Sequence, residues 1–280
     1  MKSTKDRDNR NNRDPILQKG VVVFLDALGT KTVWSRKEPS KYIEAWGNVI
    51  GLIRENAELY DKATQNDAIS PKLNVIAFSD TIILSLSHNL DKFKENLNLF
   101  TPYLIIGIIL RYMLYNAIIE EDIYLRGVIS SGEFYVKDSM IIGPAVEEAA
   151  EWYEKPEWFG VSTTPSATYG IKFLRENGNL SDEALNESFI SYPVPMKNNP
   201  TLESYAVLWP TGGVYYKIKV EKVAISFEAR TSEDRKKVLK NSKIKLLESF
   251  SSSGLIGVSS ELKYKNTLDF FDYVAETLSK

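Results

Sequence analysis

The segment VVVFLDALGT, Val21–Thr30, is an apolar run that ends on Asp26 and is followed by a short turn around Gly29. A continuous apolar run of this kind is typical of a strand that is buried on both faces of a sheet. An unpaired carboxylate at the end of such a strand destabilises the fold unless a positive charge neutralises it. The segment therefore predicts a central strand that ends beside a cation, and a metal ion is one candidate.

The composition limits the kinds of chemistry open to the chain. Its 280 residues, 43% of them hydrophobic, can bury a full core and exceed the usual length of one domain, so a domain with an extension is expected. The net charge of -2 gives no general field that would favour nucleic acid. The chain has no cysteine and one histidine, which argues against disulfides, Ser/His/Asp triads and multi-histidine zinc sites. Any metal ion would be held by oxygen, and the lack of cysteine fits the cytoplasm.

Two segments could be mistaken for targeting signals. Residues 1–15 have no apolar run after their charges, so we expect a disordered tail rather than a secretory leader. The apolar segment 97–119 is interrupted by Pro102 and Arg111, and its longest uncharged run is shorter than a membrane span. We therefore expect a core helix there, no membrane association and a cytoplasmic protein.

Hydrophobic periodicity gives the order of the elements in the first half of the chain. Residues 73–87 contain two strand-like runs around Ser79-Asp80 with no polar loop between them, which predicts a tight hairpin with a carboxylate at its tip. The other expected elements are a strand at 20–28, a helix at 40–63, the core helix at 97–119, strands at 123–136 and 139–142, and a helix that begins at 143–144. This order predicts an α+β fold in which helices cover a mixed sheet.

The second half gives weaker signals. Residues 163–200 predict turns, a polar helix and an irregular proline-rich run, and residues 203–212 predict a strand. Residues 259–278 predict a closing helix with an apolar core face. Trp158 and Trp209 are expected to pack in the core rather than to stack on a base.

Asp26 and Asp80 stand at equivalent places, one at the end of a strand and one at the tip of a neighbouring hairpin. Either could be structural alone, since aspartate is common in turns. Together, and followed by a helix start at Gly29-Thr30-Lys31, they would make an oxygen cage for Mg²⁺ or Mn²⁺ beside backbone N–H groups able to hold phosphate.

Four motifs resemble the class III nucleotidyl cyclases in their order along the chain: FLDALGT, AFSDTIILS, RGVISSGEF and GPAV. They look most similar to the pyrimidine cyclases of bacterial Pycsar antiphage systems, and the C-terminal LKYKNTLDFFDYV also looks like that group. The resemblance covers residues 18–160. It implies a ferredoxin-like cyclase core with a mixed, mostly antiparallel sheet at 16–165, and a C-terminal α/β extension at 166–280 that packs on the core.

The resemblance also implies roles for individual residues. Asp26, Asp80 and the carbonyl of Ala27 would hold two divalent ions, Mn²⁺ or Mg²⁺, for in-line displacement at phosphorus. The N–H groups of residues 28–31 would bind the triphosphate. Arg126 would pair with phosphate or with a carboxylate near the metals, unless it forms only a surface ion pair. The catalytic candidates are Asp26, Asp80 and Arg126, and the substrate-binding candidates are Phe24, Ala27, Leu28, Gly29, Thr30, Lys31 and Ser79.

The helix after GPAV departs from the purine cyclases. Where these enzymes have an asparagine and an arginine, this chain has Glu147 and Glu151, so the usual ribose orienter and transition-state cation are missing. Either another cation, Arg126 or Lys31, replaces that arginine, or the protein binds nucleotide without turnover. The pyrimidine group shares the departure, which favours the first option. In a third interpretation the glutamates are only a solvated helix face, formed by Glu147, Glu148, Glu151 and Glu154.

The strand before Asp80 lacks the lysine with which purine cyclases read the purine edge. It carries Ile76 and Ala77, with Lys72 set further back, and Asp138 stands only at the start of the later strand. The resemblance therefore implies that UTP is converted to 3′,5′-cyclic UMP and pyrophosphate, with CTP as the alternative substrate.

The resemblance further implies a homodimer with its active site at the interface, and a cyclic nucleotide that a separate effector reads in phage defence. Two other classes stay open. One is a nucleotide sensor without catalysis. The other is a phosphatase of the haloacid dehalogenase type, in which a nucleophilic Asp26 would need a partner two residues on, where Leu28 stands.

Overall fold

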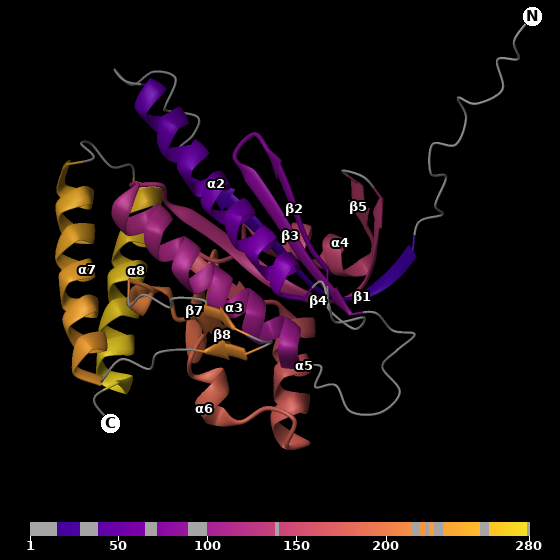
Figure 1. Ribbon diagram of the computed structural model, residues 1–280. Coiled ribbons are helices and arrows are strands. Elements are labelled where there is room, and N and C mark those ends of the chain that lie inside the picture. The colour runs from indigo at the N-terminus through magenta and orange to yellow at the C-terminus, as the bar shows by residue number, and fades with distance from the viewer. Residues whose placement is uncertain are drawn as a thin grey trace, which may run out of the picture.

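The computed structural model describes residues 16–28, 39–64, 72–88, 100–137, 140–213, 219–221, 224–226, 232–252 and 258–278. The predicted disordered tail, residues 1–15, lies outside these ranges. The elements, labelled as in Figure 1, are β1 (Ile16–Ala27), α2 (Pro39–Thr64), β2 (Lys72–Phe78), β3 (Thr81–His88), α3 (Phe100–Tyr115), the π-helical turn η2 (Asn116–Glu120), β4 (Leu125–Lys137), β5 (Met140–Ile142), α4 (Pro144–Trp152), β6 (Gly160–Thr163), α5 (Pro165–Glu176), α6 (Asp182–Leu185), β7 (Phe189–Met196), β8 (Asn199–Val207), the 3-10 turn η3 (Trp209–Thr211), β9 (Lys219–Glu221), β10 (Ala224–Ser226), α7 (Ser232–Ser252) and α8 (Val258–Thr277).

The strands of the described ranges form one eight-stranded mixed sheet and one small hairpin. The order in the large sheet is β2-β3-β1-β4-β6-β8-β7, with β5 paired to β4, while β9 pairs with β10. The pairing is antiparallel throughout the large sheet except between β4 and β6, which run parallel. This arrangement confirms the predicted α+β class with a mixed, mostly antiparallel sheet.

Strand β1 lies near the middle of the sheet and is buried on both faces, as its apolar run predicted. Val21, Val23 and Leu25 belong to the main core, to which α2 and α3 contribute. Val22 belongs to a second, smaller core that α4 covers. Figure 1 shows α2 and α3 along one side of the sheet, with α4 on the other. Since side chains alternate along a strand, Asp26 shares the α4 face with Val22.

Helix α4 begins where the sequence predicted, because Pro144 stands at its first turn and Gly143 precedes it. Gly143 has a positive φ of 135°, and a Cβ there would lie 2.8 Å from the Cα of Phe134. A glycine is therefore required for α4 to return closely over β4.

Helix α3 confirms the predicted core helix. Among the described helices, only Pro102–Glu120 is long and apolar enough to cross a membrane, and 72% of its most apolar 18-residue segment is buried inside the structure. Arg111 is 2% exposed and donates hydrogen bonds to the carbonyls of Glu187, at 2.6 Å, and Thr211, at 3.1 Å. These backbone acceptors explain how the core accommodates the arginine that interrupts the apolar run.

The C-terminal half differs from expectation in one element. The proline-rich run predicted to be irregular contains strand β7, so that prediction was wrong. β7 is an edge strand of the sheet, and an edge strand tolerates proline because one side of its backbone has no ladder to complete.

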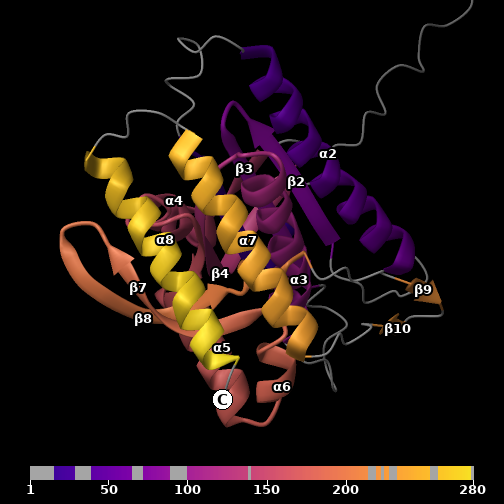
Figure 2. The ribbon, with the colours of Figure 1, turned by 90° about the vertical axis from the view of Figure 1, so that its left-hand side faces the viewer.

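The closing helix α8 does form, and it lies beside α7 (Figure 2). Its residues Phe270, Phe271 and Val274 are buried, as predicted. Trp158 and Trp209 are fully buried and make edge contacts with Phe270 and Phe271, at ring-centroid distances of 4.7 Å and 5.2 Å. Both tryptophans therefore belong to the core, as the sequence indicated.

Candidate active site

Asp26 lies at the end of β1, between the two strands that carry the other charged candidates. Its Cα partners are Thr81 at the start of β3 and Arg126 at the start of β4. The Asp26 side chain is 16% exposed. The carboxylate is therefore mostly withdrawn from water at the edge of the core.

The β2–β3 hairpin brings Asp80 to the same end of the sheet. Phe78 pairs with Thr81, so Ser79 and Asp80 alone form the turn, and Ser79 has a positive φ of 56°. The Ala27 N–H donates to the carbonyl of Asp80 at 2.9 Å, which ties the hairpin tip to the end of β1. The hairpin with a carboxylate at its tip is thus confirmed, and the fold places the two aspartates together.

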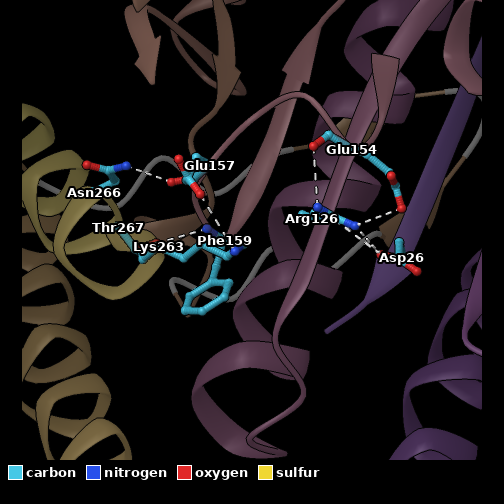
Figure 3. A network of polar contacts seen from close by, with 8 residues as sticks. All are labelled: Asp26, Arg126, Glu154, Glu157, Phe159, Lys263, Asn266 and Thr267. Carbon is cyan, nitrogen blue, oxygen red and sulfur yellow. Dashed lines mark hydrogen bonds and ion pairs between the residues drawn. The ribbon is translucent and has the colours of Figure 1, made fainter. Parts of the chain in front are cut away.

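Arg126 forms a buried ion pair with Asp26 (Figure 3). Its Nε and Nη2 donate to Oδ2 of Asp26 at 3.1 Å and 2.9 Å, and Nη2 also reaches Oε1 of Glu154 at 3.3 Å. Nη1 lies 3.4 Å from the Glu154 carbonyl oxygen, and the residue is 6% exposed. The alternative of a surface ion pair is therefore wrong, because the register of β1 with β4 buries the guanidinium.

Several charged groups act on Asp26. Burial raises the pKa of Asp26 above its ordinary value, the Arg126 guanidinium opposes that rise, and the negative charges of Asp80 and Glu154 add to it. The Asp26 carboxyl thus lies in the field of one guanidinium and two other carboxylates. Hard oxygen donors in a negative field suit Mg²⁺ or Mn²⁺, so these residues fit a divalent ion.

The protein alone supplies few metal ligands at this place. In the part of the chain that the structure describes, no group of three or more His, Cys, Asp or Glu side chains could hold a metal ion. The donor set would be the two aspartates and a backbone oxygen, with the remaining positions filled by water or substrate phosphate. Mg²⁺ commonly binds proteins in this way.

Of the four backbone amides predicted to bind phosphate, the structure describes only that of Leu28. The Leu28 N–H donates to the Tyr124 carbonyl at 2.8 Å, so the expectation that this amide is open to phosphate is wrong for the structure as it stands. The reason is tertiary, because the chain entering β4 lies beside the end of β1. Gly29, Thr30 and Lys31 lie outside the described residues.

Phe24 and Ser79, two substrate-binding candidates, make contacts within the protein. Phe24 is half-buried and its ring packs on Tyr153, with 4.6 Å between centroids. The Arg126 guanidinium lies 5.8 Å from the centroid of the same Tyr153 ring. The Ser79 carbonyl accepts a hydrogen bond from Nε1 of Trp46 at 3.0 Å, so α2 holds the hairpin tip.

Tyr42 of α2 also belongs to this site, although the sequence indicated only a helix core. Its hydroxyl oxygen is buried and has no hydrogen-bond partner among the described residues. Burial raises the Tyr42 pKa to about 12, and the negative charges of Asp80 and Asp26 contribute. The available signal was the four-residue spacing from Tyr42 to Trp46, which puts both rings on one helix face.

The glutamates of α4 and the loop after it divide into two kinds. Glu147 is exposed, and Glu151 is exposed and pairs with Lys155 at 2.7 Å. Glu148 instead accepts hydrogen bonds from the backbone N–H and the hydroxyl of Ser166, while Glu154 binds Arg126. The solvated-face interpretation therefore holds for Glu147 and Glu151 and is wrong for Glu148. Glu154 is 58% exposed and also binds Arg126, so the interpretation is incomplete for that residue.

The segment after Glu154 is fixed by α8 (Figure 3). Asn266 donates to the Glu157 carbonyl at 2.7 Å, and the Phe159 N–H donates to Oγ1 of Thr267 at 2.9 Å. A hollow of about 660 Å³ opens beside Glu154, and its lining includes Trp152, Lys155, Lys197 and Asn198. Its size is that of a small-molecule site.

No protein-family model matches the sequence, and no curated protein matches it. Among solved structures, the chain is similar to the catalytic core of a rhodopsin-guanylyl cyclase with converted specificity in complex with ATPalphaS (12% identity over 70% of this chain and 98% of that chain, TM-score 0.40). It is also similar to an adenylate/guanylate cyclase/hydrolase from Silicibacter pomeroyi (18%, 69% and 96%, TM-score 0.36) and to a bacterial light-regulated adenylyl cyclase (13%, 82% and 59%, TM-score 0.37). All three TM-scores are below 0.5, so these likenesses carry no argument about activity.

Proposed function

We propose that this chain is a nucleotide cyclase that converts a nucleoside triphosphate to a 3′,5′-cyclic nucleotide and pyrophosphate. The observation that carries the proposal is the meeting of Asp26 and Asp80 at one end of the sheet, beside the buried guanidinium of Arg126. Paired carboxylates with a fixed cation suit a reaction in which negative charge develops at phosphorus. The order of motifs that resembles the class III nucleotidyl cyclases supports the same reaction.

The Asp26 and Asp80 carboxylates and the Ala27 carbonyl would hold two divalent ions, Mn²⁺ or Mg²⁺. When bound, such ions acidify the 3′-hydroxyl and offset phosphate charge. The 3′-oxygen bonds to the α-phosphorus, the bond from that phosphorus to the pyrophosphate oxygen breaks, and the hydroxyl proton passes to solvent. The chain's contribution is a fixed spacing of the carboxylates, because the Ala27 N–H holds the Asp80 carbonyl at 2.9 Å.

We assign the transition-state cation to Arg126, with Lys31 as the other candidate. Glu151 cannot stabilise a developing negative charge, and it is 71% exposed. Arg126 is already desolvated, and a guanidinium can exchange a carboxylate for a phosphate oxygen without changing its own geometry. The hollow of about 660 Å³ beside Glu154 offers nearby room for a nucleotide.

We propose UTP as the substrate, with CTP second. Ile76 and Ala77 of β2, on the strand that leads to the hairpin aspartate, offer a purine no polar side-chain partner. An unsatisfied polar group costs about 1 to 3 kcal/mol, which is roughly tenfold to hundredfold in rate for each missing contact. UTP should therefore be cyclised at least about ten times faster than ATP or GTP.

We further propose a cytoplasmic homodimer whose cyclic nucleotide is read by a separate effector in antiphage defence. The dimer is supported by Phe78 at the end of β2, a large apolar side chain that is 81% exposed. Residues 16–165 would be the cyclase core, and 166–280 an extension packed on it. The defence role rests on the resemblance alone.

Separate reactions of the protein with each of the four NTPs and Mn²⁺, followed by chromatography of the products, test the proposal. Cyclic UMP as the main product is expected. Cyclic AMP or cyclic GMP as the main product would refute the pyrimidine assignment. If UTP raises the Tm and no NTP is turned over, the protein is a nucleotide sensor.

A further inference from the structure

Tyr42 occupies a defined position beside the two aspartates. It lies near the start of α2, one turn before Trp46. The Trp46 indole is bonded to the Ser79 carbonyl at 3.0 Å, so this face of α2 is fixed against the turn that carries Asp80. Tyr42 is partly buried and packs against the main core. Its hydroxyl is thus held in place by a helix that is itself anchored at the hairpin tip.

The Tyr42 hydroxyl is an unsatisfied hydrogen-bonding group among the described residues. Its oxygen is shielded from solvent, and no partner for it exists in the part of the chain that the structure describes. Buried hydroxyl groups are nearly always bonded, and an unsatisfied one in a folded protein requires an explanation. A phenylalanine would fill the same space without this cost, so packing alone does not account for a tyrosine here.

The surroundings of the hydroxyl indicate what its partner would be. Burial, followed by the negative charges of Asp80 and Asp26, raises the pKa of Tyr42 to about 12, so the group stays a hydrogen-bond donor at neutral pH. A hydroxyl donor beside two carboxylates is suited to an oxygen atom that a cation brings there. An oxygen bonded to a divalent ion is such an acceptor.

We propose that Tyr42 is a ligand-binding residue of this site, donating its hydroxyl hydrogen bond to an oxygen that a divalent ion holds at Asp26 and Asp80. This inference rests on the proposed function, because it assumes a divalent ion at the aspartates. The acceptor is either water on the ion or a phosphate oxygen of the nucleotide. Water as the acceptor requires only the bound ion, whereas a phosphate oxygen requires the nucleotide as well.

The substitution Tyr42→Phe removes the hydroxyl and keeps the ring. The variant and the wild-type protein are titrated with Mn²⁺ alone, and then with 3′-deoxy-UTP in the presence of Mn²⁺, a nucleotide that cannot be cyclised. Binding is followed by electron paramagnetic resonance of free Mn²⁺ and by the ligand-induced rise in Tm. Without ligand, the variant should have an equal or higher Tm, because no buried hydroxyl is left unsatisfied.

The expected result is a Kd that is raised about tenfold or more, the usual effect of losing a hydrogen bond to a charged group. A weaker Kd for Mn²⁺ alone identifies a water on the ion as the acceptor. A weaker Kd for 3′-deoxy-UTP only identifies a phosphate oxygen. Wild-type Kd values for both ligands would overturn the inference.

Tyr192→Phe is the matched control. Tyr192 is also buried, and burial together with the charge of Asp269 raises its pKa to about 12 as well. It lies on β7, and β4, β6 and β8 separate that strand from β1. Both Kd values should therefore stay at the wild-type level in this variant.

The inference and the proposed function can fail separately. If the wild-type protein binds Mn²⁺ and 3′-deoxy-UTP but turns over no NTP, the cyclase proposal fails. The Kd values of wild type and Tyr42→Phe can still be compared, so the inference about Tyr42 is still tested. If the wild-type protein binds neither Mn²⁺ nor 3′-deoxy-UTP, the inference about Tyr42 is overturned.

Discussion

Removing the guanidinium of Arg126 should leave a buried carboxylate without its counter-charge. We consider the substitution Arg126→Met, which keeps the length of the side chain. In the native protein, burial raises the pKa of Asp26 from its ordinary value of 3.8, and the Arg126 guanidinium opposes that rise. Without that charge the folded-state pKa rises further, so ionised Asp26 opposes folding at neutral pH.

The magnitude follows from the burial of the pair. Breaking a fully buried ion pair by removing one partner costs about 3 to 5 kcal/mol. Since Asp26 is 16% exposed, we expect a smaller loss of unfolding free energy, about 2 to 4 kcal/mol. For a chain of this length, that loss corresponds to a fall in Tm of roughly 3 to 7 °C.

The pH dependence has a definite sign. A carboxyl group whose folded-state pKa is raised destabilises the fold only where it is ionised. The stability deficit of Arg126→Met should therefore be full at neutral pH and shrink as the pH falls through the raised pKa towards 3.8. Thermal unfolding followed by circular dichroism between pH 4 and 8, with wild type in parallel, measures the deficit at each pH.

The double variant Arg126→Met/Asp26→Asn is the control, because it removes both charges and should recover most of the lost stability at neutral pH. Mn²⁺ should raise the Tm of the single variant, since a divalent ion can replace the missing charge at Asp26. A deficit that is equal at pH 4 and pH 8, or a double variant as unstable as the single one, would refute this reasoning.

Three other outcomes are expected. Asp26→Ala and Asp80→Asn should each abolish cyclisation; Asp80→Asn should keep a near-normal Tm, and Asp26→Ala should lower it because the buried Arg126 guanidinium loses its closest partner. Retained activity in Asp80→Asn would favour a phosphatase in which Asp26 alone is the nucleophile. Glu154→Gln should lower kcat because Oε1 of Glu154 holds Arg126 at 3.3 Å. The same substitution should change the unfolding free energy by less than about 1 kcal/mol because the Glu154 side chain is 58% exposed. The control Glu151→Gln, at an exposed pair with Lys155, should leave kcat unchanged. In the proposed dimer, activity per subunit should fall on dilution below the dimer dissociation constant, and constant specific activity in a sample shown to be monomeric would contradict it.

Local sequence predicted the elements whose signals are short-range. The apolar run of β1, the two-residue turn at Ser79-Asp80 and the proline and glycine at the start of α4 each act on the backbone within a few residues. The meeting of Asp26 and Asp80 could also be predicted, because a hairpin and a neighbouring strand pair by simple rules. The apolar helix α3 was identified as core because Pro102 and Arg111 interrupt it.

Tertiary structure alone decided the contacts that complete the site. The Asp26–Arg126 pair joins residues 100 positions apart, and only the register of β1 with β4 sets it. The Leu28 amide is taken by Tyr124 for the same reason, since two distant segments meet at the end of β1. The edge position of β7, which makes its prolines acceptable, depends on the strand order of the whole sheet.

Tyr42 shows most clearly where sequence reasoning stops. Its helical spacing predicted a core residue, and the ring does pack against the core. What its hydroxyl faces depends on how α2 docks on the β2–β3 hairpin, which no local pattern records. Local propensity and hydrophobic periodicity act over a few residues and determine the elements, whereas the charges and donors of a site are brought together by packing between elements distant in the chain.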